Sequence, residues 1–128
     1  MKLIYVAGPY TGKDYKEIEA NIKAAEEVSI ELIKLGWAVI TPHKNFAHYE
    51  TYEGMKCYNG KKISYQNWID MDIELLSRCD AILMMKGWRN SKGSVSEHTF
   101  AQSKTDTYYE EKGLPEPWDE PHTEPDKR

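Results

Sequence analysis

The chain has 128 residues, 40% of them apolar, and its 21 acidic and 17 basic residues give a formal net charge of −4. This length predicts one compact domain and is too short for two ordinary ones. Residues 110–128 hold seven acids and three bases, so residues 1–109 carry no net charge and predict no basic surface for DNA or RNA. Two cysteines without metal-binding spacing, and no signal peptide or membrane span, lead us to expect a cytoplasmic protein without a membrane partner.

The first third of the chain has the pattern of a βαβ unit. Residues 2–7 form a short apolar run followed by a Gly-Pro pair, which predicts a buried strand and a tight loop. Apolar residues recur at helical spacing over residues 13–35, and Gly36 stands where a helix commonly ends. Residues 37–41 predict a second strand. This order of elements predicts a parallel sheet with a right-handed crossover.

The middle of the chain combines a long loop with a second amphipathic helix. Residues 43–62 have no apolar period, and we expect a loop of this length to be functional. Helical spacing returns over residues 64–78, where Asp72 falls on the apolar face. A carboxyl group buried there without a partner has a raised pKa, whereas an edge position leaves it in solvent. The sequence leaves both interpretations open.

A third strand is predicted at residues 81–85, followed by a turn rich in Gly, Ser and Asn. We expect a helix from Ser94 to about residue 104 and a weak fourth strand at residues 105–109. The turn therefore lies at the carboxyl edge of the sheet, where open α/β sheets bind ligands. Glu97, in the first turn of the helix, is expected to stay ionised and is a candidate nucleophile or base. The pattern Ser94-x-x-Glu97 is equally that of a capping box, which needs no ligand.

The last segment, residues 113–128, is rich in proline and acidic residues. This composition excludes a helix or a central strand. It predicts either a disordered tail or an arm that binds a neighbouring subunit of an oligomer. We therefore place the domain at residues 1–112.

The sequence lacks the common cofactor motifs. The stretch from Gly8 to Lys13 is similar to a phosphate-binding loop, but the spacing between its glycines is one residue too short. No Gly-x-Gly-x-x-Gly follows a strand, and the histidines show no zinc spacing. We predict neither an organic cofactor nor a metal.

Two carboxyl groups in different environments, Glu97 and Asp72, indicate glycosidic chemistry. One carboxylate attacks the anomeric carbon, and the other group supplies a proton to the leaving group. Such chemistry needs two separated pKa values, and we expect Glu97 to be charged and Asp72 to have a raised pKa. Tyr5 lies near the end of the first strand, where its hydroxyl can orient Glu97; plain core packing is the other interpretation.

Three stretches of the sequence form a recognisable set. They are Ile4-Tyr5-Val6-Ala7-Gly8-Pro9-Tyr10, Asp72 with Asp80-Ala-Ile-Leu, and Gly93-Ser94-x-x-Glu97-x-x-x-Ala101. In this order and spacing they resemble the nucleoside 2-deoxyribosyltransferase superfamily, and the form Gly-Trp-x-x-Ser-x-Gly-Ser is similar to its small phage and bacterial branch. The resemblance covers roughly residues 2–104.

The resemblance implies a role for each matching residue. Glu97 matches the nucleophile that attacks C1′ of a 2′-deoxyribosyl group, Tyr5 the tyrosine that positions it, and Asp72 the acid that protonates the departing base. The residues from Gly8 to Tyr10 match the family's first loop, which borders the sugar and the base. Members of the superfamily are oligomers that complete each site with a neighbour, so a homo-oligomer is expected.

One position departs from the members that take free nucleosides. Those members have Asp six residues before the nucleophile, where this chain has Ser91, and related hydrolases of nucleoside 5′-monophosphates have Ser there. A Ser hydroxyl can donate to a phosphate that an Asp repels. Lys92, Arg89 and Lys13 can supply positive charge, although the phosphate-binding members carry an Arg in the first loop and this chain does not.

We therefore predict a small flavodoxin-like α/β fold, a three-layer α/β/α sandwich with a parallel sheet of four or five strands. The predicted function is cleavage or transfer at the N-glycosidic bond of 2′-deoxynucleosides or their 5′-monophosphates through a glycosyl-Glu97 intermediate. The alternatives are a nucleotide sensor or sequestering protein without turnover, and a structural domain in which Ser94 only caps a helix. The candidate substrate-binding residues are Gly8, Pro9, Tyr10, Lys13, His43, Trp68, Trp88, Ser91, Gly93 and Ser94.

Overall fold

In the computed structural model, which describes residues 1–45 and 60–126, one parallel sheet forms the centre of the fold. Its strand order is β2-β1-β3-β4, and every neighbouring pair is parallel. The predicted parallel sheet and its βαβ unit are confirmed. The strands are β1 (Leu3–Ala7), β2 (Ala38–Ile40), β3 (Ala81–Met84) and β4 (Asp106–Tyr109).

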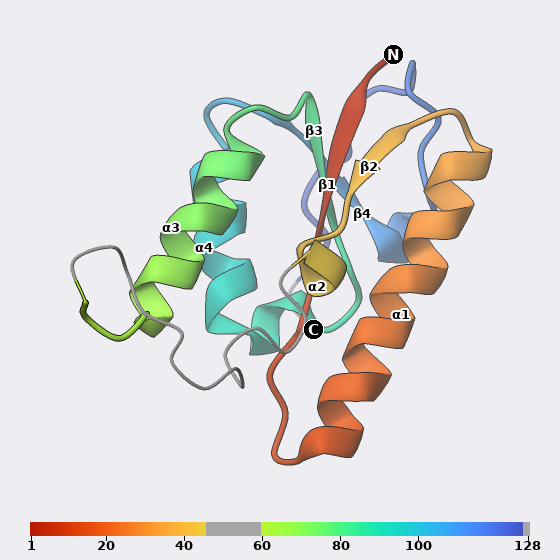
Figure 1. The fold of residues 1–128 in the computed structure, drawn as a ribbon. Coiled ribbons are helices and arrows are strands. Elements are labelled where there is room, and N and C mark those ends of the chain that lie inside the picture. The colour runs from red at the N-terminus through yellow and green to blue at the C-terminus, as the bar shows by residue number, and fades with distance from the viewer. Residues whose placement is uncertain (46–59, 127–128) are drawn as a thin grey trace.

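Helices cover both faces of this sheet (Figure 1). Helix α1 packs on one face, α3 and α4 pack on the other, and the short α2 lies near the carboxyl ends of the strands. The predicted three-layer sandwich is therefore confirmed. Of the loop expected at residues 43–62, residues 46–59 lie outside the described part, and its start belongs to a helix. The helices are α1 (Tyr15–Lys34), α2 (Pro42–Asn45), α3 (Tyr65–Leu76) and α4 (Lys92–Ala101).

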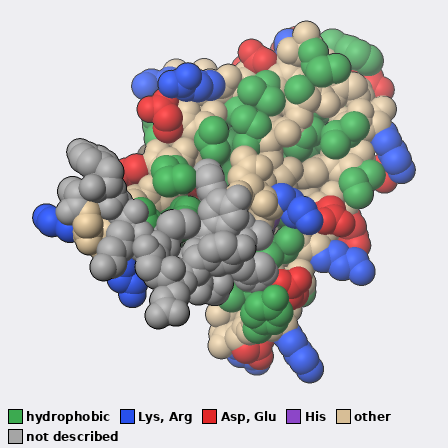
Figure 2. Space-filling model, viewed as in Figure 1, with side chains coloured by type: hydrophobic (Ala, Val, Ile, Leu, Met, Phe, Trp, Pro, Cys, Tyr) green, Lys and Arg blue, Asp and Glu red, His purple; other side chains and the backbone are tan. Residues whose placement is uncertain are grey.

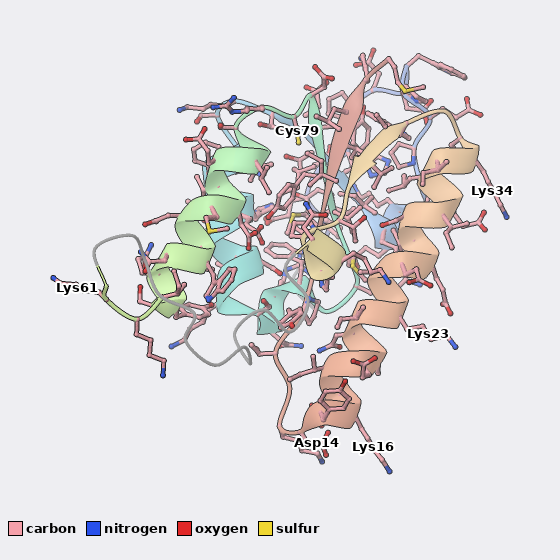
Figure 3. All side chains as sticks on the ribbon, in the orientation of Figure 1. Asp14, Lys16, Lys23, Lys34, Lys61 and Cys79 are labelled. Carbon is pink, nitrogen blue, oxygen red and sulfur yellow. The ribbon has the colours of Figure 1, made fainter. Side chains whose placement is uncertain are left out.

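Helix α1 has defined signals at both ends. The Asp14 side chain accepts a hydrogen bond from the backbone N–H of Glu17 at 2.9 Å, which caps the amino end. Gly36 follows the helix with a φ of 106°, a left-handed conformation that favours glycine. Lysines on the outer face, such as Lys23, point away from the sheet (Figure 3). The predicted amphipathic helix is confirmed.

Alternation along β1 sends successive side chains into two separate cores. Ile4 and Val6 pack toward α1, whereas Tyr5 and Ala7 pack in the core below α3 and α4. Tyr5 is fully buried. This alternation puts its hydroxyl on the same side of the sheet as α4.

The C-terminal segment, residues 114–126, packs on the same chain, whereas composition predicts a disordered tail or an oligomer arm. The indole N–H of Trp37 donates to the carbonyl of Pro115 at 2.8 Å. His122 lies beside the edge strand, where its Nδ1 accepts from the backbone N–H of Tyr109 at 2.9 Å. The segment thereby covers part of a sheet edge whose polar groups need partners.

Charged side chains of both signs are interspersed on the face shown in Figure 2. This view agrees with the neutral charge balance of residues 1–109. Within residues 1–45 and 60–126, no helix has the length and apolar character needed to cross a membrane.

Candidate active site

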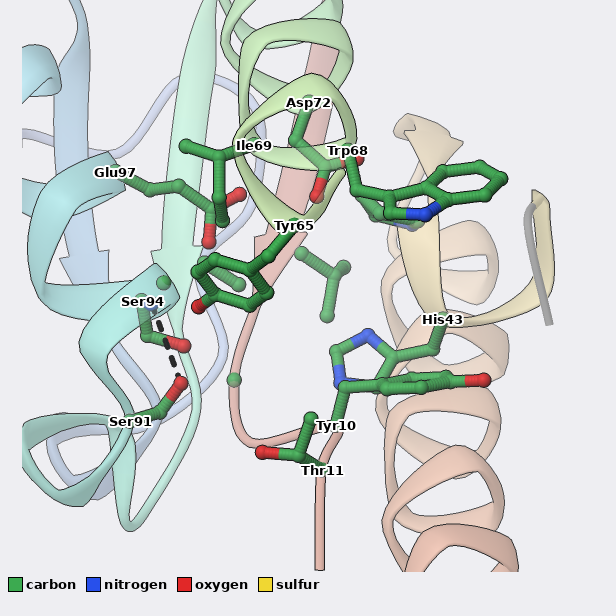
Figure 4. A pocket seen from close by; sticks show the side chains of 15 residues that line it. Tyr10, Thr11, His43, Tyr65, Trp68, Ile69, Asp72, Ser91, Ser94 and Glu97 are labelled. Carbon is green, nitrogen blue, oxygen red and sulfur yellow. Dashed lines mark hydrogen bonds between the residues drawn. The ribbon is translucent and has the colours of Figure 1, made fainter. Parts of the chain in front are cut away.

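A cavity of about 310 Å³ lies at the carboxyl end of β1, between the loop that follows this strand and helices α2, α3 and α4 (Figure 4). Its volume falls in the range of small-molecule sites. Open parallel sheets bind ligands at this edge. The structure brings the following predicted residues to the cavity wall: Gly8, Tyr10, His43, Trp68, Asp72, Ser91, Gly93, Ser94 and Glu97.

Glu97 enters the cavity from α4 and is 6% exposed. The hydroxyl of Tyr5, from β1, donates a hydrogen bond to its Oε2 atom. Burial raises the pKa of Glu97 to about 8; the hydrogen bond from Tyr5 opposes this rise and the charge of Asp72 adds to it. Burial and the charge of Asp72 therefore oppose the ionised form that the sequence predicts for Glu97. It lies in the second turn of α4, beyond the free N–H groups of the first turn.

Asp72 reaches the same space from α3 (Figure 4). Burial raises its pKa to about 6, as its place on the apolar helix face predicts. Its Oδ1 atom is buried and has no hydrogen-bond partner among the residues that the structure describes. A buried carboxyl oxygen without a partner is costly for the fold and is available to a ligand.

The start of α4 differs from the expected capping box. The helix begins at Lys92, and its cap is Ser91, whose Oγ accepts from the backbone N–H of Ser94 at 3.3 Å. Ser94 is 1% exposed, and its Oγ has no partner within the described ranges. Ser94 and Glu97 therefore do not form a capping box, and the interpretation of Ser94 as the helix cap was wrong.

The first loop and α2 form the opposite side of the cavity. Gly8 packs against the chain after β3, where an added Cβ would lie 2.8 Å from the Cβ of Met85. Pro9 does not line the cavity, but its carbonyl lies 2.8 Å from Nε2 of His43. The His43 ring is 4% exposed, and its centroid lies 6.0 Å from that of Tyr10. The close approach at Gly8 thus holds this loop against the end of the sheet.

Lys13 and Trp88, both expected to bind substrate, lie outside the cavity lining. Lys13 is exposed near the start of α1 and lies 3.6 Å from Glu17. Trp88 is 5% exposed and packs on His98 with 4.2 Å between ring centroids. Its indole belongs to the core between the sheet and the helices, because the 3-10 helix Trp88–Asn90 turns this side chain away from the cavity.

Tyr65 and Ile69 line the cavity and were missed in the sequence. Both belong to the face of α3 that carries Asp72. They precede Asp72 by seven and three residues, which is the spacing of one helical stripe. Counting back from Asp72 at helical spacing in the sequence would have identified both residues.

No group of three or more His, Cys, Asp or Glu residues in the described part of the chain is arranged to hold a metal ion. The polar groups of the cavity wall are carboxyl, hydroxyl and imidazole groups from the loop after β1 and from helices α2, α3 and α4. These groups are suited to proton transfer and hydrogen bonding.

Comparisons with known proteins agree with this architecture. The family model described as "Domain of unknown function (DUF4406)" matches residues 2–107. A search of the curated proteins found no match. Among solved structures, the 2-deoxyribosyltransferase of the psychrotolerant bacterium Bacillus psychrosaccharolyticus is similar, with a TM-score of 0.54 and 17% sequence identity, over 84% of this chain and 70% of that chain. A likeness at this identity establishes a shared fold.

Proposed function

The chain belongs to the DUF4406 family. From this premise, and from its likeness in fold to a 2-deoxyribosyltransferase, we propose that it cleaves or transfers at the N-glycosidic bond of 2′-deoxynucleosides or their 5′-monophosphates. One observation carries the proposal. Glu97, held by the Tyr5 hydroxyl, and Asp72, with a buried oxygen that no described residue pairs, face one cavity from two helices. A nucleophile with an orienting donor and a separate acid are the groups that glycosidic cleavage requires.

In the first step a carboxylate oxygen of Glu97 attacks C1′ of the sugar. The bond between C1′ and the base nitrogen breaks, its electron pair stays with the base, and the proton of Asp72 goes to the departing base. In the second step a base nitrogen or a water oxygen attacks C1′. The ester bond breaks, its electron pair returns to Glu97, and the proton of the acceptor goes to Asp72.

The two raised pKa values set the pH range of this reaction. Burial raises the pKa of Asp72 to about 6 and that of Glu97 to about 8, so between these values the pair holds one proton. The productive arrangement has the charge on Glu97 and the proton on Asp72, and the higher pKa of Glu97 makes it the rarer of the two forms that hold one proton. The hydrogen bond from Tyr5 favours this arrangement because it stabilises the carboxylate form of Glu97. We expect a bell-shaped pH profile of kcat, since below the range no nucleophile is charged and above it no acid remains.

The 5′ end of the substrate is proposed to lie at the start of α4, beside Ser91. Three basic residues were candidates for a 5′-phosphate. Lys13 lies by Glu17 outside the cavity lining, and Arg89 donates to the carbonyl of Pro125 at 2.9 Å. Lys92, exposed at the first position of α4, is the candidate that remains beside Ser91. Free nucleosides and monophosphates are therefore both included in the test.

The test is to incubate the protein with each of the four 2′-deoxynucleosides and their 5′-monophosphates, with and without a second free base. Base release and base exchange are followed by chromatography. We expect turnover of at least one substrate, and a loss of at least about a thousand-fold with Glu97→Gln. Glu74→Gln is the matched control, since Glu74 lies on the surface of α3 by Arg78. No turnover of any substrate by a folded protein overturns the proposal.

A second function, binding of a nucleotide without turnover, is favoured by one observation. With its pKa raised to about 8, Glu97 holds a proton for most of the time at neutral pH, and a neutral carboxyl group is a hydrogen-bond donor to a ligand. In that case Glu97→Gln keeps nucleotide affinity, measured by calorimetry, and no base is released by either protein. The homo-oligomer expected from the resemblance stays a prediction for size-exclusion chromatography with light scattering.

A further inference from the structure

Three buried polar atoms on the cavity wall have no hydrogen-bond partner among residues 1–45 and 60–126. They are Nδ1 of His43, Oδ1 of Asp72 and Oγ of Ser94, and they come from α2, α3 and α4. Most buried polar atoms in folded proteins are paired, so unpaired atoms around one cavity indicate a ligand that supplies the missing partners. Ser94 carries a hydroxyl group, and so does Asp72 when it is protonated, so each of them can donate or accept a hydrogen bond. His43 is different because its other ring nitrogen is already engaged.

The contact of His43 with the first loop decides which of its nitrogens carries the proton. Nε2 lies 2.8 Å from the carbonyl oxygen of Pro9. A carbonyl only accepts, so Nε2 donates and holds the hydrogen. Burial lowers the pKa of the ring more than the backbone carbonyls of Pro9 and Gly8 raise it, so the net shift favours the neutral form. In the neutral ring the second nitrogen, Nδ1, carries no hydrogen and can only accept a hydrogen bond.

We infer that His43 Nδ1 accepts a hydrogen bond from the ligand, so that the cavity selects molecules with an N–H or O–H donor where they face α2. This inference rests on the proposed function only for the class of ligand, a nucleoside or nucleotide. It specifies the atom, its protonation and the chemical group that must meet it. A ligand with only acceptors at this place leaves Nδ1 unpaired and repels its lone pair.

The surroundings of His43 indicate that it contacts the base rather than the sugar. Tyr10 and Trp68 lie on the same side of the cavity as His43, whereas Ser91 and Ser94 lie on the opposite side (Figure 4). Flat rings such as bases stack on aromatic side chains. The donor that meets Nδ1 is therefore an exocyclic amino group or a ring N–H on the edge of the base.

The first test measures binding of three pairs of nucleosides that differ by one donor. The pairs are 2′-deoxyadenosine and purine 2′-deoxyriboside, 2′-deoxycytidine and 2-pyrimidinone 2′-deoxyriboside, and thymidine and N3-methylthymidine. Affinities are measured by calorimetry on the full chain carrying Glu97→Gln, which prevents turnover. For the preferred base, we expect the member with the donor to bind about 10- to 100-fold more tightly. His43→Phe removes the acceptor and keeps a ring, so it is expected to bring the two members within about threefold.

A histidine outside the cavity provides the matched control. His122→Phe changes the same type of side chain on the C-terminal segment, and the preference for the donor is expected to stay. Equal affinities within every pair for the chain with His43 intact overturn the inference. A preference that persists in folded His43→Phe also overturns it.

The second test does not depend on any variant or on turnover. Nitrogen-15 spectra of the labelled full chain should show His43 as the neutral tautomer with hydrogen on Nε2. Addition of the preferred nucleoside should shift the Nδ1 resonance as that atom accepts a hydrogen bond. Hydrogen on Nδ1, a cationic ring at neutral pH, or an Nδ1 signal that no nucleoside moves overturns the inference. Absence of base release with a shifted Nδ1 signal contradicts the proposed reaction alone.

Discussion

Helix α4 separates two buried polar regions, one that faces the cavity and one around His98 and Tyr109. On the cavity side, Glu97 is held by the Tyr5 hydroxyl, and Ser94 Oγ has no partner among the described residues. On the other side, His98 Nε2 lies 2.7 Å from the hydroxyl of Tyr109 and 3.4 Å from a carboxylate oxygen of Glu124. The His98 ring also packs on Trp88, whose indole N–H has no partner among the described residues.

The difference separates polar groups that stabilise the fold from groups that stay available to a ligand. Buried groups with partners in the chain recover the free energy lost when they leave water. Buried groups that face a cavity without partners lower the stability of the empty protein, and a ligand can recover that loss. We therefore expect substitutions on the two sides of α4 to have opposite effects on stability and activity.

The largest expected effect is a gain in stability from Glu97→Gln at high pH. Burial raises the pKa of Glu97 in the folded chain from 4.5 to about 8, so the folded state holds this proton more tightly than the unfolded state. The contribution of the proton is fully present below pH 4.5 and is lost as pH rises through about 8. Glu97→Gln removes the cost of the buried charge and is expected to raise the free energy of unfolding by about 3–5 kcal/mol at high pH.

Urea denaturation at pH 4 and at pH 9 measures this gain. The exposed control Glu74→Gln is expected to change stability by less than about 0.5 kcal/mol at both values. An equal effect of Glu97→Gln at the two pH values contradicts the raised pKa.

The next effect is on activity and concerns the Tyr5 hydroxyl. Tyr5→Phe removes the hydrogen bond that favours the charged form of Glu97, so the productive arrangement of the two carboxyl groups becomes rarer. We expect kcat to fall by about a hundred-fold, with the upper limb of its pH profile moved to higher pH. A fall in kcat without any shift of the profile argues that Tyr5 acts through packing alone.

On the paired side of α4, Tyr109→Phe is expected to affect stability and leave the reaction nearly unchanged. The substitution removes the hydroxyl that lies 2.7 Å from His98 Nε2. We expect the free energy of unfolding to fall by about 1–2 kcal/mol and kcat to stay within about threefold. Tyr15→Phe, at an exposed tyrosine of α1, is the control for loss of a hydroxyl. A large loss of kcat with normal stability contradicts the division between the two sides.

The smallest effects compare two serines at the start of α4. Ser91 caps the helix, so Ser91→Ala is expected to cost about 0.5–2 kcal/mol. Ser94 Oγ has no partner in the part of the chain described, so Ser94→Ala is expected to be neutral or slightly stabilising and to weaken ligand binding. Thermal unfolding of both variants, with calorimetry on Ser94→Ala, measures the difference. A larger stability loss at Ser94 than at Ser91 restores the capping role first considered for Ser94.

Features that depend on neighbours in the sequence could be predicted from it. The period of apolar residues gave α1 and α3, and Gly36 marked the end of α1 because its left-handed conformation is a local requirement. The succession strand, helix, strand along the chain predicted a parallel sheet. The carboxyl edge of that sheet was the predicted place of the site, and the cavity lies there. Asp72 was identified because it interrupts the apolar face of a helix.

Features that depend on distant neighbours could not be predicted in this way. Ser91 and Ser94 both stand near the start of α4, and local pattern favoured the wrong one as the cap. Trp68 and Trp88 are both aromatic residues near candidate site positions, but only Trp68 lines the cavity. Proline-rich composition excluded a helix in the C-terminal segment, but it gave no information on docking to Trp37 and Tyr109.

The sequence by itself determined the main helices and strands, their parallel pairing, and which residues carry carboxyl, hydroxyl and imidazole groups, because periodicity and chirality act locally along the chain. Only the tertiary structure decided the states of those groups. The pKa of Glu97 depends on burial by other elements and on a hydroxyl from β1, and the tautomer of His43 depends on a carbonyl of the first loop. Desolvation and hydrogen bonding are set by whatever atoms lie within a few ångströms, and folding brings those atoms from distant parts of the chain.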